Sequence, residues 1–94
     1  MAKKIKVDFD SRYDILYLGY VDGPESYGVD IDNRIVKFVS MKDDTPTGIE
    51  VTDYLDYFKD RKFSDDIPFS KYLNSKKVRA FAQNGLSSSC VLTG

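Results

Sequence analysis

Hydrophobic and polar residues alternate along much of the first half of this chain, which is the pattern of half-buried β-strands. The alternation is clear in residues 5–9 and 27–31, a partner strand follows over 34–38, and a further strand begins at 49–51. Residues 15–18, Ile-Leu-Tyr-Leu, are continuously apolar and predict a central strand covered on both faces. Segments rich in Asp, Gly and Pro separate these runs and predict turns. The first half therefore predicts an antiparallel sheet of about five strands, arranged as hairpins.

One hairpin carries the sharpest structural prediction. The Asp-Asn pair at 32–33 tolerates positive φ, so it suits a two-residue loop between the third and fourth strands. That loop places Val29 opposite Val36, because the length of a hairpin loop fixes the register. Tyr27 and Phe38 then lie on the same buried face.

The second half changes to helical periodicity. The spacing predicts a short helix near 53–60 and a second helix near 69–83, with apolar residues along one side of the latter and Gly85 as its C-terminal stop. Residues 84–94 are small and polar and form either a tail or a short last strand. Because 94 residues fit the usual size of one domain, the sequence predicts a single α+β domain spanning 1–94.

The composition excludes most catalytic machinery. The chain has no histidine and a single cysteine, so it lacks Ser-His-Asp and Cys-His constellations, imidazole zinc sites and any internal disulfide. Cys90 is interpreted as an ordinary thiol. Gly19, Gly23 and Gly28 match no glycine-rich phosphate loop. The sequence therefore predicts a protein without catalytic residues, cofactors or metal ligands, and not an enzyme.

Pairs of aspartates keep a metal-binding or hydrolytic alternative open. Asp8 and Asp10 share one face of a strand. Asp30 and Asp32 do the same, so two carboxylates could converge. Neither pair is followed by the glycine and glutamate that complete a calcium-binding loop. We interpret all four as solvated strand and turn residues, and as the candidate partner-binding residues of the chain.

Charge is unevenly distributed, although the formal net charge is only −1. All 15 acidic residues lie within 7–66, whereas 67–94 contain four basic residues and no acidic one. The basic residues of the predicted C-terminal helix are too few for more than weak, non-specific phosphate binding, and the acidic body would repel nucleic acid. Nucleic acid is therefore not an expected partner.

The chain also lacks the sequence features of export and membrane insertion. Its start, MAKKIKVDFD, has no apolar segment of the kind that signal peptides contain. No stretch approaches the ~18 apolar residues of a membrane span. We therefore expect a cytoplasmic location and no membrane partner.

Three segments carry a family resemblance. They are Tyr-Asp-Ile-Leu-Tyr-Leu at 13–18, preceded by Asp10, then Val-Asp-Ile-Asp-Asn-Arg-Ile-Val at 29–36, and Gly-Ile-Glu-Val at 48–51. Together they resemble the small prokaryotic "domain of unknown function" family number 2283 over residues 7–51. The chain departs from the family pattern because it lacks the hairpin glycine before Arg34 and carries the extra segment 37–47. The resemblance implies a compact β-rich module without an assigned activity, and family members encoded beside toxin-like genes imply a neutralising role.

These observations favour a small, non-catalytic protein-binding module. It would act as an antitoxin-like or inhibitor-like partner of a basic, nucleic-acid-processing protein, because carboxylates on a sheet face mimic phosphates and steer a basic partner. A first alternative is a self-associating β-module that pairs edge strands into a homodimer. A second alternative is an Asp-based metal-binding or hydrolytic domain.

Overall fold

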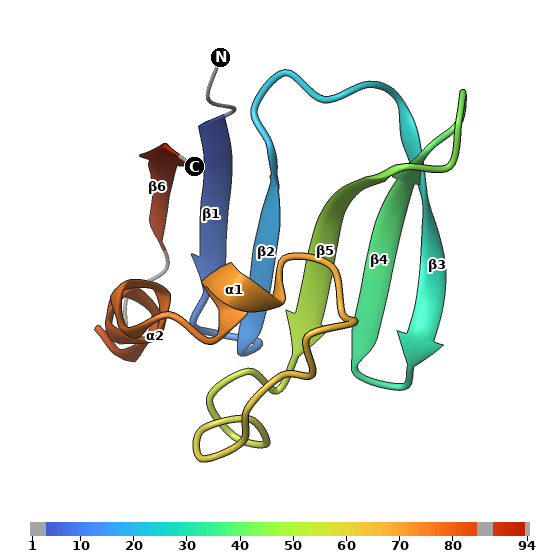
Figure 1. Cartoon of the computed structure of the whole chain (residues 1–94). Coiled ribbons are helices and arrows are strands. Elements are labelled where there is room, and N and C mark those ends of the chain that lie inside the picture. The colour runs from blue at the N-terminus through green and yellow to red at the C-terminus, as the bar shows by residue number, and fades with distance from the viewer. Residues whose placement is uncertain (1–3, 85–87, 94) are drawn as a thin grey trace.

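The computed structural model describes residues 4–84 and 88–93, which form a six-stranded antiparallel sheet packed against two short helices (Figure 1). The strands are β1 (Lys4–Asp10), β2 (Ile15–Tyr20), β3 (Ser26–Asp32), β4 (Ile35–Ser40), β5 (Pro46–Thr52) and β6 (Ser88–Thr93). The helices are α1 (Ser70–Leu73) and α2 (Lys76–Gln83). Across the sheet the order is β3-β4-β5-β2-β1-β6.

The predicted α+β class is therefore confirmed, with six strands in place of five. The sixth strand lies within the segment 84–94, which the sequence left open between a tail and a strand. It pairs with β1, so the last strand adds an edge beside the first. Gly85, the predicted helix stop, lies outside the described residues.

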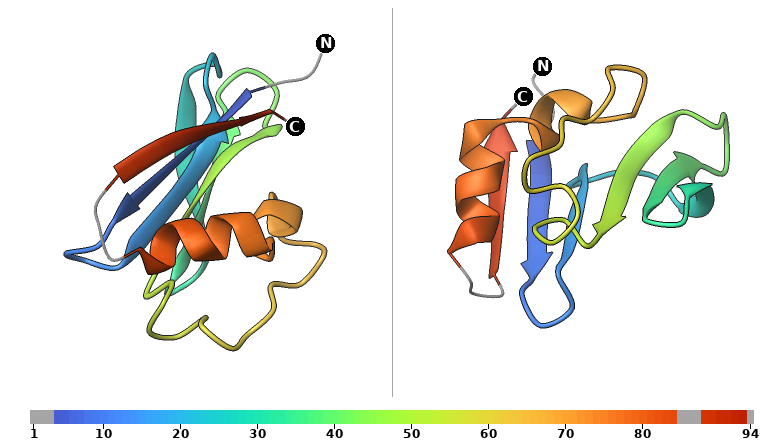
Figure 2. Two further views of the ribbon diagram at one scale, coloured as in Figure 1. Left: turned by 90° about the vertical axis from the view of Figure 1, so that its left-hand side faces the viewer. Right: turned by 90° about the horizontal axis from the view of Figure 1, so that it is seen from below.

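One face of the sheet carries the core. Both helices and the loop 53–69 lie on this side of the sheet (Figure 2, left). The buried cluster comprises Ile5, Val7, Phe9, Leu16, Leu18, Ile35, Ile49, Val51, Tyr54, Phe58, Phe63, Leu73, Val78, Ala82 and Leu92. We call this side the covered face. The opposite side, over which the described residues place no helix or loop, is the open face.

The strand at 15–20 is central, as predicted, because β2 lies between β5 and β1. The prediction that both of its faces are covered is wrong. Leu16 and Leu18 are fully buried on the covered face, whereas Ile15 and Tyr17 are only half-buried on the open face. The run is continuously apolar because core residues on the covered face alternate with aromatic and aliphatic residues that lie along the open face.

The predicted register of the β3–β4 hairpin is wrong by one residue. Val29 pairs with Lys37, and Asp30 pairs with Val36. Because paired residues point to the same side of a sheet, Val29 and Val36 lie on opposite faces. Tyr27 and Phe38 are separated in the same way, since Phe38 pairs with Gly28.

A bulge and an aspartate cause this shift. The pairing slips between Asp30 and Asp32, so the two-residue turn moves to 33–34. The Asp32 carboxylate accepts the backbone N–H groups of Arg34 at 2.7 Å and Ile35 at 3.1 Å, which stabilises that turn. Ile35 is 2% exposed in the core, and its burial fixes which face of β4 is covered.

Residues 53–60 form turns and not the predicted helix. Asp53 has a φ of 59°, outside the helical region. The Asp14 carboxylate accepts the N–H groups of Leu55 and Asp56, both at 2.9 Å. Asp14, from the β1–β2 turn, thus caps the first N–H groups of this segment. The N–H groups of Tyr57 and Phe58 both bond to the carbonyl oxygen of Asp53, so the segment makes a single turn.

The predicted helix at 69–83 is divided into α1 and α2, with its end at Gln83 confirmed. Ser75 is extended, with ψ of 146°, and its hydroxyl accepts the N–H of Val78 at 3.1 Å as an N-cap. The side chain of Asn74 bonds to the backbone of Phe63. Its Oδ1 accepts the N–H of Phe63 at 2.7 Å, and its Nδ2 donates to the Phe63 carbonyl oxygen at 2.9 Å. These two polar side chains bond outside a continuous helix and break it.

Candidate functional site

Two rows of paired residues cross the open face. The acidic row runs through Asp30, Val36, Glu50, Tyr17, Asp8 and Ser89. The neighbouring glycine row runs through Gly28, Phe38, Gly48, Gly19, Lys6 and Val91. Adjacent strands are ~4.8 Å apart, so the three carboxylates of the acidic row are about 10 Å apart. One apolar or aromatic side chain lies between each pair of carboxylates.

The glycine row lets aromatic rings lie along the sheet. Tyr17 and Phe38 meet edge to face, with centroids 5.8 Å apart and planes inclined by 66°. A methyl group at Gly19 would collide with the Tyr17 hydroxyl, and one at Gly48 would lie 3.1 Å from the same oxygen. The two rings therefore form an apolar platform beside the carboxylates.

The acidic row alters the chemistry of the platform. Burial raises the pKa of the Tyr17 hydroxyl, and the carboxylates of Asp8 and Glu50 raise it further. Asp8 also approaches Lys6 at 3.7 Å, but both groups are substantially exposed, so this ion pair contributes little. The strand residues of the open face that the structure describes include four acidic side chains and two basic ones, Lys4 and Lys6. The face is therefore acidic.

The four predicted partner-binding residues are brought together only in part. Asp8 and Asp30 belong to the acidic row but lie four strand spacings apart, about 19 Å. Asp10 lies on the same face, where its carboxylate accepts the N–H of Arg12 at 2.9 Å. Asp32 is used by the β3–β4 turn instead. The bulge places it on the other face from Asp30, so the prediction that Asp30 and Asp32 share a face is wrong. Asp8 and Asp10 share the open face, as predicted.

Sequence reasoning missed Glu50 and the aromatic platform. Glu50 alternates with Ile49 and Val51, and that alternation was a readable sign that it points away from the core. Tyr17 had no such sign, because it lies within a continuously apolar run. Its position follows from glycines on two other strands, which are distant in sequence.

The described residues contain no group of three His, Cys, Asp or Glu side chains arranged to hold a metal ion. Neither described helix has the length or the apolar character needed to span a bilayer.

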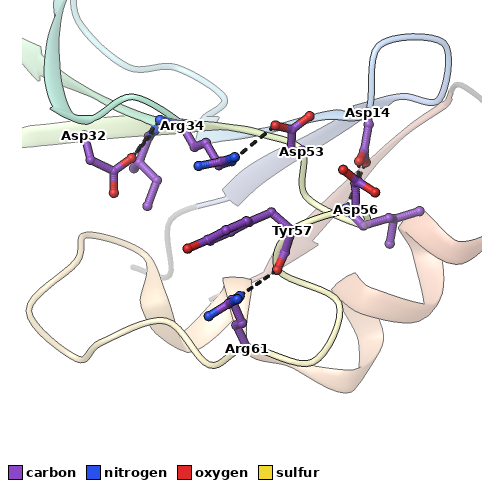
Figure 3. Close-up of polar contacts among 9 residues, drawn as sticks. Asp14, Asp32, Arg34, Asp53, Asp56, Tyr57 and Arg61 are labelled. Carbon is purple, nitrogen blue, oxygen red and sulfur yellow. Dashed lines mark hydrogen bonds and ion pairs between the residues drawn. The ribbon is translucent and has the colours of Figure 1, made fainter.

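A second polar cluster lies where the loop 53–69 meets the β3–β4 turn (Figure 3). Arg34 Nε donates to Asp53 Oδ2 at 3.2 Å. The Tyr57 ring lies between the guanidinium groups of Arg34 and Arg61, whose central carbons are 4.0 Å and 4.2 Å from the ring centroid (Figure 3). Both contacts are within cation–π range.

Arg79 of α2 holds this loop from beneath. Its guanidinium donates to the carbonyl oxygens of Phe58 at 2.8 Å and Arg61 at 2.7 Å. The Tyr54 hydroxyl donates to the carbonyl of Leu73 at 2.9 Å. Burial raises the pKa of Tyr54 to about 12, opposed by the positive charge of Arg79. A long loop without secondary structure is thus fixed by Arg79 from outside it and by its own Tyr54.

Comparisons with protein-family models, with curated proteins and with solved structures found no match to this chain. The resemblance to the domain-of-unknown-function family therefore stays a prediction of the sequence.

Proposed function

We propose that this protein is a non-catalytic binding module that engages a basic protein partner through the open face. The acidic row is the observation that carries this proposal. It combines three carboxylates about 10 Å apart with the half-buried side chains of Val36 and Tyr17, on a face that no described helix or loop covers. Acidic groups beside an apolar surface are suited to a cationic partner.

The two components of this surface have different roles. Carboxylates steer a basic partner and raise its association rate. The rings of Tyr17 and Phe38 supply apolar area that a partner can bury. A partner matches the acidic row when it presents cations about 10 Å apart. A polyproline-type segment does so at every third residue, and an α-helix at every seventh.

The narrower form of the proposal is an antitoxin-like or inhibitor-like role. Proteins that process nucleic acids carry basic surfaces for phosphates, which lie in regular rows. Asp30, Glu50 and Asp8 form a regular row of negative charge and would occupy such a surface in place of the nucleic acid. This role rests on charge complementarity and on the resemblance described above.

Charge reversal on the open face tests the proposal. The variant Asp30→Lys with Glu50→Lys is compared with Asp60→Lys with Asp65→Lys, which changes the net charge equally on an exposed loop of the covered side. A labelled arginine-rich peptide serves as the defined probe, and each protein also serves as bait for affinity capture. We expect the open-face variant to lose association rate at low salt, with the difference shrinking at high salt.

Two outcomes would count against an acidic docking face. One is an open-face variant that folds and binds the peptide as fast as the wild type at low salt. The other is capture of the same proteins by all three baits. Support requires a basic protein that the wild type and the loop variant retain and the open-face variant loses.

Self-association is a second candidate because β3 is an unpaired edge among the described residues. Tyr27 and Ile31 on this strand are 44% and 39% exposed. A dimer through this edge would be insensitive to salt and to Glu50→Lys alone, because Glu50 lies on the interior strand β5, whereas Asp30 belongs to the edge strand itself. It would be abolished by Gly28→Pro, because the β3–β4 register turns the N–H of Gly28 away from β4 and toward the free edge. Sedimentation of the wild type and these variants at low and high salt separates the two candidates.

A further inference from the structure

A cavity beside the loop 53–69 has the composition of an anion site. Its volume is about 410 Å³, within the range of small-molecule sites. Three of its lining residues, Arg34, Arg61 and Lys62, are cationic. The lining carboxylate, Asp32, already accepts two backbone N–H groups of its own turn. Arg34 is paired with Asp53, which does not line the cavity, so the lining itself carries three cations against one carboxylate.

The two guanidinium groups are each anchored through one nitrogen. Arg34 Nε is bonded to Asp53, and Arg61 Nε donates to the carbonyl oxygen of Tyr57 at 3.0 Å (Figure 3). Within residues 4–84 and 88–93, the Nη groups of these two side chains donate no hydrogen bond to a protein acceptor. These Nη donors are the forked groups with which arginine binds oxyanions.

The Tyr57 ring lies between the two guanidinium groups and fixes both beside the cavity that all three residues line. Their central carbons are no more than about 8 Å apart, because both lie over one ring at 4.0 Å and 4.2 Å. Like charges at that separation repel each other, and an anion placed near both relieves the repulsion. Arg79 fixes the backbone beneath them, so the donors are already positioned before a ligand arrives.

We propose that this cavity binds a small phosphomonoester. A phosphomonoester at neutral pH carries nearly two negative charges and three acceptor oxygens, which match the cationic lining. The cavity is larger than a bare phosphate needs, and Ile35, Phe63 and Ile67 provide an apolar wall for the organic part of the ligand. The site is separate from the open face and does not depend on the proposed function.

Isothermal titration with three probes tests this site. Inorganic phosphate carries only the charged part of the ligand, phenol carries only the apolar part, and phenyl phosphate carries both. We expect phenyl phosphate to bind more tightly than inorganic phosphate, and phenol not to bind. Affinity for phenyl phosphate should rise between about pH 5 and about pH 7.5, because the second phosphate pKa is about 6.

A matched pair of variants locates the site. Arg61→Gln removes an exposed guanidinium and should weaken phenyl phosphate binding about tenfold or more, the effect of losing hydrogen bonds from a charged group. Lys71→Gln removes an exposed charge from α1, outside this cavity, and should leave the affinity unchanged. Thermal unfolding confirms that both variants fold.

Three results would overturn the proposal. The first is equal binding of phenol and phenyl phosphate, and the second is equal loss in the two variants. The third is tighter binding of a short single-stranded oligonucleotide without a terminal phosphate, because the ligand would then be a phosphodiester backbone.

Discussion

The covered and open faces of the sheet are made by the same strands but hide apolar surface in different ways. On the covered face, aliphatic side chains such as Leu16 and Val51 are fully buried under the helices and the loop 53–69. On the open face, Tyr17 and Phe38 lie over glycines and stay half-exposed. One face therefore supplies the close packing on which stability depends, and the other keeps apolar area available to a partner.

The two faces also differ in what shifts the pKa of a tyrosine hydroxyl. Tyr54, under the covered face, has its pKa raised to about 12 by burial, while Arg79 pulls it down. Tyr17, on the open face, has its pKa raised by partial burial and then by the carboxylates of Asp8 and Glu50. Acidic groups surround the tyrosine of the open face, whereas a cation lies near the tyrosine of the covered face. The two faces thus differ in charge as well as in packing.

The largest expected effect comes from deleting the same methyl groups on each face. Val51 is 0% exposed in the core, and Val36 is half-buried on the open face of the neighbouring strand. Val51→Ala should lower the free energy of unfolding by about 2–3 kcal/mol, because it leaves a cavity among packed neighbours. Val36→Ala should lower it by less than about 1 kcal/mol. Urea unfolding followed by circular dichroism measures both, and equal losses would show that the open face is also part of the core.

The second effect appears at alkaline pH. An unfolded tyrosine ionises near 10.0, whereas Tyr54 in the folded protein ionises near 12. The stability that depends on its neutral hydroxyl is fully present below pH 10 and is lost as pH rises toward 12. This loss should be about 2 kcal/mol. Tyr54→Phe should therefore flatten the fall of unfolding free energy over this interval.

Tyr13→Phe provides the control for that measurement, since Tyr13 is 62% exposed. Its alkaline slope should match the wild type. The slope is the informative quantity, because Tyr54→Phe also removes the hydrogen bond to Leu73 and lowers stability at every pH. A Tyr54→Phe slope equal to the wild-type slope would mean that the hydroxyl is not desolvated by the covered face.

The third effect compares two glycines of the open face. An added Cβ at Gly48 would lie 2.8 Å from the Leu18 carbonyl oxygen, so relief requires backbone movement between β2 and β5. At Gly19 the added group meets the end of the Tyr17 side chain, which can rotate away. Gly48→Ala should cost about 1–3 kcal/mol and Gly19→Ala less than about 1 kcal/mol. Thermal and urea unfolding rank the two, and the reverse order would contradict the described packing of Tyr17.

The sequence predicts the covered face well because its signals are local. The alternation at 5–9 identifies the buried side of β1, and the helical pattern identifies the end of α2 at Gln83. It does not predict the β3–β4 register, which depends on the bulge and on Ile35 pairing with Val51 of β5. The turns at 53–60 have a similar cause, because the capping carboxylate comes from Asp14, about forty residues earlier.

The candidate sites are predicted only in part for the same reason. The acidic row takes one residue from each strand, so its members are never neighbours in sequence. The sequence identifies Asp8 and Asp30, but each as one of a pair along its own strand and without the platform that lies between the two strands. The cluster of Arg34, Tyr57 and Arg61 was not identified, although a long polar segment without clear periodicity is typical of a functional loop.

The smallest expected effect tests the electrostatics that distinguish the open face. Asp8 and Glu50 flank Tyr17 in the acidic row and raise the pKa of its hydroxyl after burial, which is the larger cause. Replacing both carboxylates by amides keeps the shape of the row and removes its charge. The pKa of Tyr17 should then fall toward 10.0 but stay above it, because burial of the ring persists.

Titration of Asp8→Asn with Glu50→Gln, followed by nuclear magnetic resonance of isotope-labelled tyrosine rings, resolves the hydroxyl of Tyr17. Asp10→Asn is the matched control, since Asp10 lies on the same face but is not among the groups that shift the pKa of Tyr17. This control should leave the titration of Tyr17 unchanged. An unchanged titration in the double variant would mean that the carboxylates do not face the hydroxyl. The acidic row would then lack the proximity to the aromatic platform on which the proposed docking surface depends.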